Sequence, residues 1–106
     1  MDRSELDEML AAVIGITESN GDRHTYFNPL SNTRMKYPAI KYSLAGVHPK
    51  FANDGTYQVK PSWAITLIDT NPDSIYVKKL LQIPYCSFGR FYVADNLNHW
   101  TFTIYN

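Results

Sequence analysis

The chain has 106 residues, of which 44% are hydrophobic and 19% are charged. This length and composition predict a single folded domain over residues 1–106, with little room for a second functional module. Ten basic residues balance ten acidic residues, which excludes the strongly basic class of dedicated nucleic-acid binders. Cys86 is the only cysteine, which excludes an internal disulfide and a thiolate metal cluster within one chain.

The N-terminal segment predicts an amphipathic helix over about residues 4–15. Its apolar residues follow the spacing of one helical stripe: Leu6, Met9, Leu10, Val13 and Ile14. We expect Ser4 to cap this helix, Asp7 to reciprocate, and Gly15 to end it. Polar turn residues then predict an exposed loop over residues 17–23.

The middle of the chain predicts two strands, over about residues 39–44 and 57–68, with a possible short strand near Tyr26. Apolar and polar residues alternate in both, with Ile40, Tyr42 and Leu44 on one side of the first. Residues 46–55 are expected to interrupt them. Pro61 cannot donate a ladder hydrogen bond, which predicts an edge strand or a bulge there.

The last third predicts a helix over about residues 72–82 and a closing β-hairpin with strands over about residues 86–93 and 99–105. Asn71 is expected to cap the helix, which would carry Ile75, Val77, Leu80 and Leu81. A polar segment rich in Asp and Asn separates the two strands, as a hairpin requires. The order predicts an α+β two-layer sandwich: a mainly antiparallel four- to five-stranded sheet with two helices packed on one face.

The sequence carries no motif for catalysis, for a cofactor or for a metal, so we expect a protein that is not an enzyme. The three histidines, at positions 24, 48 and 99, have no metal-ligand spacing. Cys86 lies in an apolar strand, where it is expected to pack as a small hydrophobe, and turn or cap roles account for Asp69, Asp73 and Asp95.

Charge and aromatic residues indicate an interaction role instead. An acidic segment contains Asp2, Glu5, Asp7 and Glu8, and a basic middle contains Arg34, Lys36, Lys41 and Lys50. These could attract each other between copies, although two ordinary solvated faces are an alternative reading. In the hairpin, Phe88, Arg90 and Tyr92 are expected to share an outward face. Exposed rings mark an interface between subunits or, alternatively, a stacking platform for single-stranded nucleic acid.

Three segments resemble small virion proteins from the neck and tail of long-tailed bacteriophages, described as tail terminators or minor tail proteins. They are Tyr37–Tyr42, Thr66–Ser74 and Leu81–His99, within a resemblance that covers about residues 24–106. The family often has an acidic residue at the position of Gly89, where this chain departs from it.

The resemblance implies a structural virion protein that forms a hexameric ring on the tail tube. Its partners would be further copies of itself, the tail tube protein and the head–tail connector protein, with DNA only passing through the ring lumen. The chain shows no signal-peptide pattern and no apolar run of bilayer length. We therefore expect synthesis in the host cytoplasm and no membrane contact. Alternatives are a head-side connector or tail-completion protein, or a small nucleic-acid-binding module.

Overall fold

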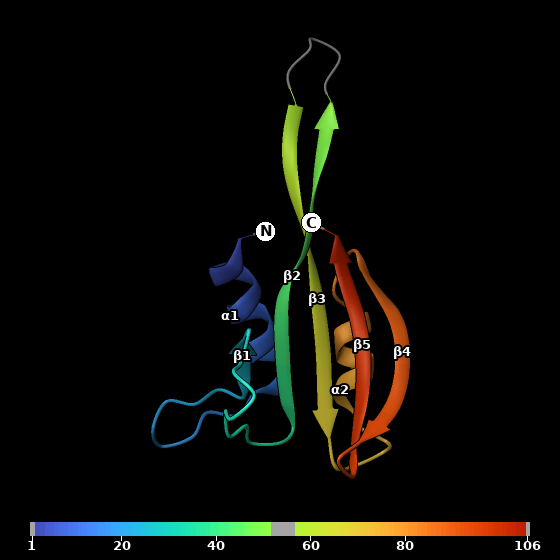
Figure 1. Cartoon of the computed structure of the whole chain (residues 1–106). Helices are drawn as coiled ribbons and strands as arrows, with labels where there is room; N and C mark the ends of the chain where they lie inside the picture. Colours follow the sequence, from blue (N-terminus) through green and yellow to red (C-terminus); the bar gives the residue numbers. More distant parts are fainter. Residues whose placement is uncertain (1, 52–56, 106) are drawn as a thin grey trace.

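A computed structural model describes residues 2–51 and 57–105 (Figure 1). The elements follow in the order α1 (Arg3–Ile14), β1 (Thr25–Phe27), β2 (Ala39–Phe51), β3 (Tyr57–Asp69), α2 (Tyr76–Leu81), β4 (Cys86–Ala94) and β5 (Leu97–Tyr105). The strands form one sheet in the order β1-β2-β3-β5-β4. Only β1 and β2 are parallel, and the other neighbours are antiparallel. The predicted α+β architecture is therefore confirmed, including the short strand near Tyr26.

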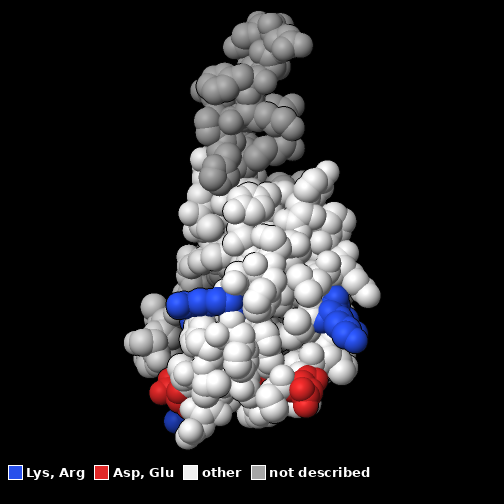
Figure 2. All heavy atoms as spheres, turned by 90° about the vertical axis from the view of Figure 1, so that its right-hand side faces the viewer, with Lys and Arg blue, Asp and Glu red and all other residues white. Residues whose placement is uncertain are grey.

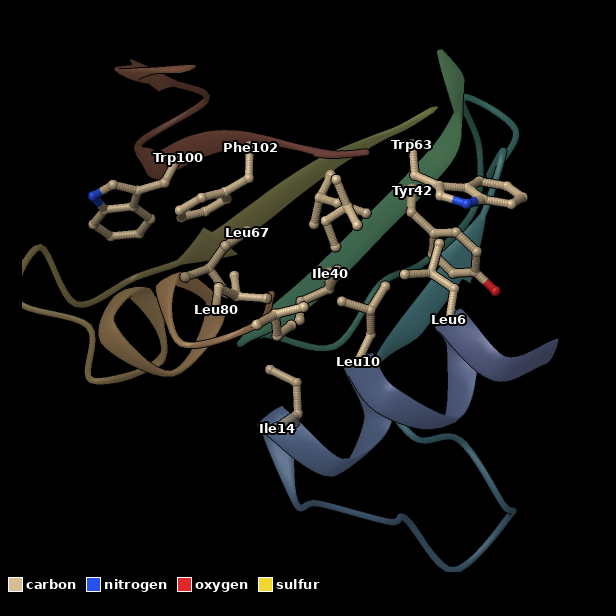
Figure 3. Close-up of a cluster of buried hydrophobic side chains, with 13 residues drawn as sticks. Leu6, Leu10, Ile14, Ile40, Tyr42, Trp63, Leu67, Leu80, Trp100 and Phe102 are labelled. Atoms are coloured by element: carbon tan, nitrogen blue, oxygen red, sulfur yellow. The ribbon is translucent and has the colours of Figure 1, made fainter. Parts of the chain in front are cut away.

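Both helices cover the same face of the sheet, and the hydrophobic core lies between them and the strands (Figure 3). From α1, Leu6, Leu10 and Ile14 are buried one turn apart, which confirms the predicted stripe. From β5, Trp100 and Phe102 point toward the same core. Each fully buried aliphatic side chain contributes about 1.5–3 kcal/mol, so this single layer supplies most of the stabilisation.

The start of α1 differs from the prediction, whereas its end agrees with it. Asp2, not Ser4, is the N-cap, and its carboxylate accepts a hydrogen bond from the Glu5 amide at 2.8 Å. Asp7 makes no capping contact, because its carboxylate is bound elsewhere. Gly15 ends the helix with φ 70°, a left-handed conformation that glycine adopts at little cost.

The expected break after residue 44 is wrong, because β2 continues to Phe51 opposite β3. A bulge between Leu44 and Gly46 takes up one extra residue, so the ladder resumes in a shifted register. Leu44 itself is 48% exposed rather than buried. The remainder of the expected break, residues 52–55, lies outside the described residues.

Beyond the bulge, β2 and β3 form a two-stranded arm, defined here as residues 47–51 and 57–61. β5 ends opposite Ser62, so neither strand of the arm has a second partner among the described strands. Figure 1 shows the arm extending past the ends of the other strands. Pro61 lies where β3 has lost its β5 neighbour, which explains how a central strand accommodates a residue without an N–H group.

The second helix begins at Tyr76, four residues later than predicted. Asn71 accepts a hydrogen bond from the Asp73 amide, and Asp69 accepts one from the Asn71 amide. These side chains therefore organise a turn before the helix instead of capping it. Leu80 is buried, whereas Ile75, which now precedes the helix, and Leu81 are exposed.

The hairpin strands are slightly longer than predicted, because only Asp95 and Asn96 form the turn. Both have positive φ, 54° and 62°, which is the conformation of a two-residue turn that Asp and Asn tolerate.

The packing of α1 gives a direct test of the core. Leu10→Ala should lower the free energy of unfolding by about 2–5 kcal/mol, because Leu10 is fully buried and truncation leaves a cavity. Leu81→Ala is the matched control, since Leu81 is 45% exposed, and it should cost less than half as much. Urea unfolding of the three proteins measures both values, and equal losses would contradict this assignment of the core.

Candidate interaction surface

The largest polar cluster surrounds Asp7 and joins four parts of the chain. The Asp7 carboxylate accepts hydrogen bonds from the Thr25 hydroxyl at 2.9 Å and the Tyr42 hydroxyl at 2.8 Å. It also forms a salt bridge with Arg23, whose guanidinium binds Glu8 at 3.0 Å. Burial and the neighbouring Asp7 carboxylate raise the pKa of Tyr42. With three donors on one carboxylate, this cluster is arranged to hold the fold together rather than to exchange protons.

A second polar cluster surrounds the buried His24. Its Nδ1 lies 2.8 Å from the Pro38 carbonyl oxygen, and its Nε2 lies 2.8 Å from the Glu18 carboxylate. His24 thereby ties the segment after α1 to the start of β2. Residues 17–23 are thus more structured than the predicted exposed loop, because Glu18 and Asp22 also bond each other through the backbone at 2.8 Å.

The other residues considered for catalysis or metal binding have contacts that serve the fold. Burial raises the pKa of the Cys86 thiol, which makes it a weaker nucleophile, and Cys86 packs against the core as predicted. His99 Nδ1 lies 3.0 Å from the Leu97 carbonyl oxygen beside the turn. Within residues 2–51 and 57–105, no three His, Cys, Asp or Glu side chains gather as metal ligands. No helix in the same residues is long and apolar enough to cross a membrane.

The acidic segment predicted as an interface is divided by the fold. Asp7 and Glu8 are bound to Arg23, whereas Glu5 is exposed and Asp2 is an exposed helix cap. Within this segment, only Asp2 and Glu5 therefore form no salt bridge with another described residue.

The basic middle is dispersed rather than gathered into one surface. Arg34 lies exposed between β1 and β2, and the Lys36 ammonium lies 4.0 Å from the Glu18 carboxylate. Lys41 lies half-buried on β2, on the sheet face without helices. The side chain of Lys50 lies outside the described residues. The roles of these four residues in an interface stay predictions.

The hairpin residues Phe88, Arg90 and Tyr92 do not share one face, because β4 has a bulge between Phe88 and Phe91. Phe88 pairs with Phe102 and lies on the helix side, whereas Tyr92 pairs with His99 on the opposite side. Alternation along a strand reverses at such an extra residue, so the predicted common outward face is wrong.

Gly89 lies close to Thr101 at this bulge. A Cβ atom added there would lie 2.6 Å from the Thr101 hydroxyl oxygen, which is too close for a real contact. The same hydroxyl accepts a hydrogen bond from the Arg90 amide at 2.9 Å. A side chain at position 89 would therefore displace this hydroxyl.

The apolar surface with the most exposed side chains lies along α2 and β4, and we call it the α2–β4 flank. Its exposed members are Ile75, Leu81, Tyr85, Phe88, Phe91 and Val93. β4 is an edge strand and contacts α2. Figure 2 shows the molecule from this side, where most of the described surface is neither acidic nor basic.

Two aromatic rings of the α2–β4 flank pack against aromatic rings of the core. Phe88 meets Phe102 edge to face with centroids 5.7 Å apart, and Phe91 lies against Trp100 at 5.3 Å. Each ring remains about half exposed. Rings fixed on one side and open on the other lose little conformational freedom on binding, as interface anchors require.

Sequence reasoning missed most of this flank. It placed Ile75 and Leu81 among the apolar residues of a longer helix, whereas both are exposed in the structure. The edge position of β4 depends on the strand order, for which the sequence carries no local signal. Searches of known protein-family models and of curated proteins find no match to this chain.

Asp7→Asn should lower the free energy of unfolding by about 2–3 kcal/mol, because the amide cannot accept from three donors as a carboxylate does. Glu8→Gln is the matched control. Its side chain is 73% exposed and makes one of the two contacts with Arg23, so it should cost less than about 1 kcal/mol. Urea unfolding at neutral pH distinguishes the two, and similar losses would show that Asp7 is not the main connection.

Tyr42 gives a prediction for alkaline pH. Its pKa is raised in the folded protein, so the unfolded chain releases this proton first, near the ordinary tyrosine value of about 10. Stability from Tyr42 is therefore complete below that pH and falls as pH rises toward the folded value. Tyr42→Phe should flatten this alkaline decline in urea unfolding measured over a pH series. An unchanged slope would contradict the coupling between Tyr42 and Asp7.

Proposed function

We propose that this protein is a structural virion component of a bacteriophage neck or tail, similar to a tail terminator, which forms a ring with further copies of itself. The ring would cap the tail tube and join it to the head–tail connector, with DNA passing through its lumen. The resemblance of residues 24–106 supports this class of protein. The α2–β4 flank is the observation that carries it.

The α2–β4 flank favours association because six exposed apolar side chains come from α2, β4 and the residues beside them, and α2 contacts β4. Exposed apolar residues with fixed aromatic anchors are typical of a protein interface. An edge strand also leaves backbone N–H and C=O groups without strand partners. Covering this surface with a second subunit would remove both the apolar groups and this edge from water.

The arm supports assembly by a separate argument. A two-stranded hairpin without further strands is marginally stable in water, and this arm projects beyond the sheet that supports its base (Figure 1). Val47 at the base of the arm is 52% exposed. Contact with a neighbouring protein, such as another subunit or the tail tube, would supply the missing burial.

Electron microscopy and light scattering of the purified full chain test this function. We expect closed rings of defined subunit number that bind the ends of purified tail tubes. Rings that bind only the connector would favour the head-side alternative. A monomer at all accessible concentrations with salt-sensitive binding to single-stranded DNA would overturn the proposal and favour the nucleic-acid-binding module.

Variants connect the assembly to the α2–β4 flank. Ile75→Asp with Val93→Asp should weaken subunit association by about 2 kcal/mol or more, roughly thirtyfold in Kd, because a charge enters an apolar contact. Leu30→Asp is the matched control, since Leu30 is 75% exposed in the segment between β1 and β2. All three substitutions are at exposed positions, so Tm should change little. If both variants assemble equally well, the α2–β4 flank is not part of the interface.

A further inference from the structure

Several exposed charges form no salt bridge within the described residues, and two pairs among them differ in sign. Asp2 and Glu5 project from the first turn of α1, where Arg3 is exposed as well. Lys78 and Lys79 on α2 border the α2–β4 flank, whereas Arg90 on β4 lies over Tyr92 on the sheet face without helices.

Neighbouring aromatic rings hold the cations of Lys79 and Arg90. The Lys79 ammonium lies 5.4 Å from the centroid of the Tyr76 ring, and the Arg90 guanidinium lies 4.8 Å from that of Tyr92. A cation on an aromatic face keeps hydrogen-bond donors for a carboxylate. At the acidic turn, Arg3 stacks over Phe27 at 4.9 Å and therefore points toward β1.

The two groups lie apart in one molecule. α1 and α2 contact each other, but Leu6, beside the acidic turn, lies at the end of α1 away from Leu80 of α2 (Figure 3). One chain therefore cannot bring its own two groups together. Two different surfaces that fit each other make a heterologous contact, which closes into a ring when the rotation between neighbours allows it.

A contact between two α2–β4 flanks fits less well. It would place the lysines of one copy near the same lysines of the other, because Lys78 and Lys79 border this surface. Like charges at an interface oppose association. Asp73 before α2 and Asp95 in the β4–β5 turn are exposed as well and offset part of this charge.

We infer that the α2–β4 flank binds the acidic first turn of α1 in a second copy of this chain, with Asp2 and Glu5 meeting Lys78 and Lys79. This inference rests on the proposed self-assembly and names the surface that each neighbour contributes. The apolar residues of the flank supply burial, and the charges select the acidic turn and fix its direction.

A charge exchange tests this contact. Glu5→Lys alone and Lys78→Glu with Lys79→Glu alone should each raise the Kd of assembly about tenfold or more, because each places like charges together. The two variants mixed in equal amounts should regain assembly, since each then offers the opposite charge to the other. The variant that carries Glu5→Lys, Lys78→Glu and Lys79→Glu together should also assemble by itself. All these positions are exposed, and unchanged Tm values control for folding.

The outcomes separate this contact from the proposed function. If wild-type protein forms rings and both charge variants assemble as the wild type does, the contact is wrong and the ring stands. If charge exchange restores association but only open chains or dimers form, the contact stands and the ring-forming function is wrong. A wild-type monomer overturns both. Loss of DNA binding in Lys78→Glu with Lys79→Glu, without any change in association, would assign these lysines to nucleic acid.

Discussion

The carboxylate of Asp7 is the interaction on which the arrangement of this protein depends most. It binds Thr25 on β1, Tyr42 on β2 and Arg23 before β1, and it belongs to α1. A half-buried carboxylate needs such donors, because leaving a charge unpaired away from water costs several kcal/mol. Leu6 and Leu10, on the same helix, then pack into the core beside Tyr42 (Figure 3). Polar and apolar contacts thus fix α1 in one position.

Placing both helices on one face decides which surfaces remain for partners. The core fills the space between helices and sheet, and α2, with only six residues, does not extend to cover the outer part of β4. Phe88 and Phe91 therefore rest on core rings while one side of each stays exposed. The same short sheet leaves the arm without neighbours beyond Ser62. Assembly with further copies would cover surfaces that this small domain cannot cover alone.

The charged residues show how folding changes an interface prediction. The acidic segment and the basic middle look like two blocks along the chain, but Arg23 binds Asp7 and Glu8 within the molecule. What remains for a neighbour is the exposed first turn of α1. The cations that border the apolar flank are Lys78 and Lys79 of α2, which lie outside the basic middle of the sequence.

The sequence by itself determined the elements with a regular pattern: the stripe of α1, the alternation in β3 and β5, and the Asp95–Asn96 turn. These depend on local backbone geometry and on which side chains avoid water. Only the tertiary structure decided the later start of α2, the bulges at Gly46 and Gly89, and the strand order. A bulge of one residue reverses the alternation of every residue beyond it, and contacts with the neighbouring strand fix its position. For that reason, Phe88 and Tyr92 lie on opposite faces, although their spacing predicts a common one.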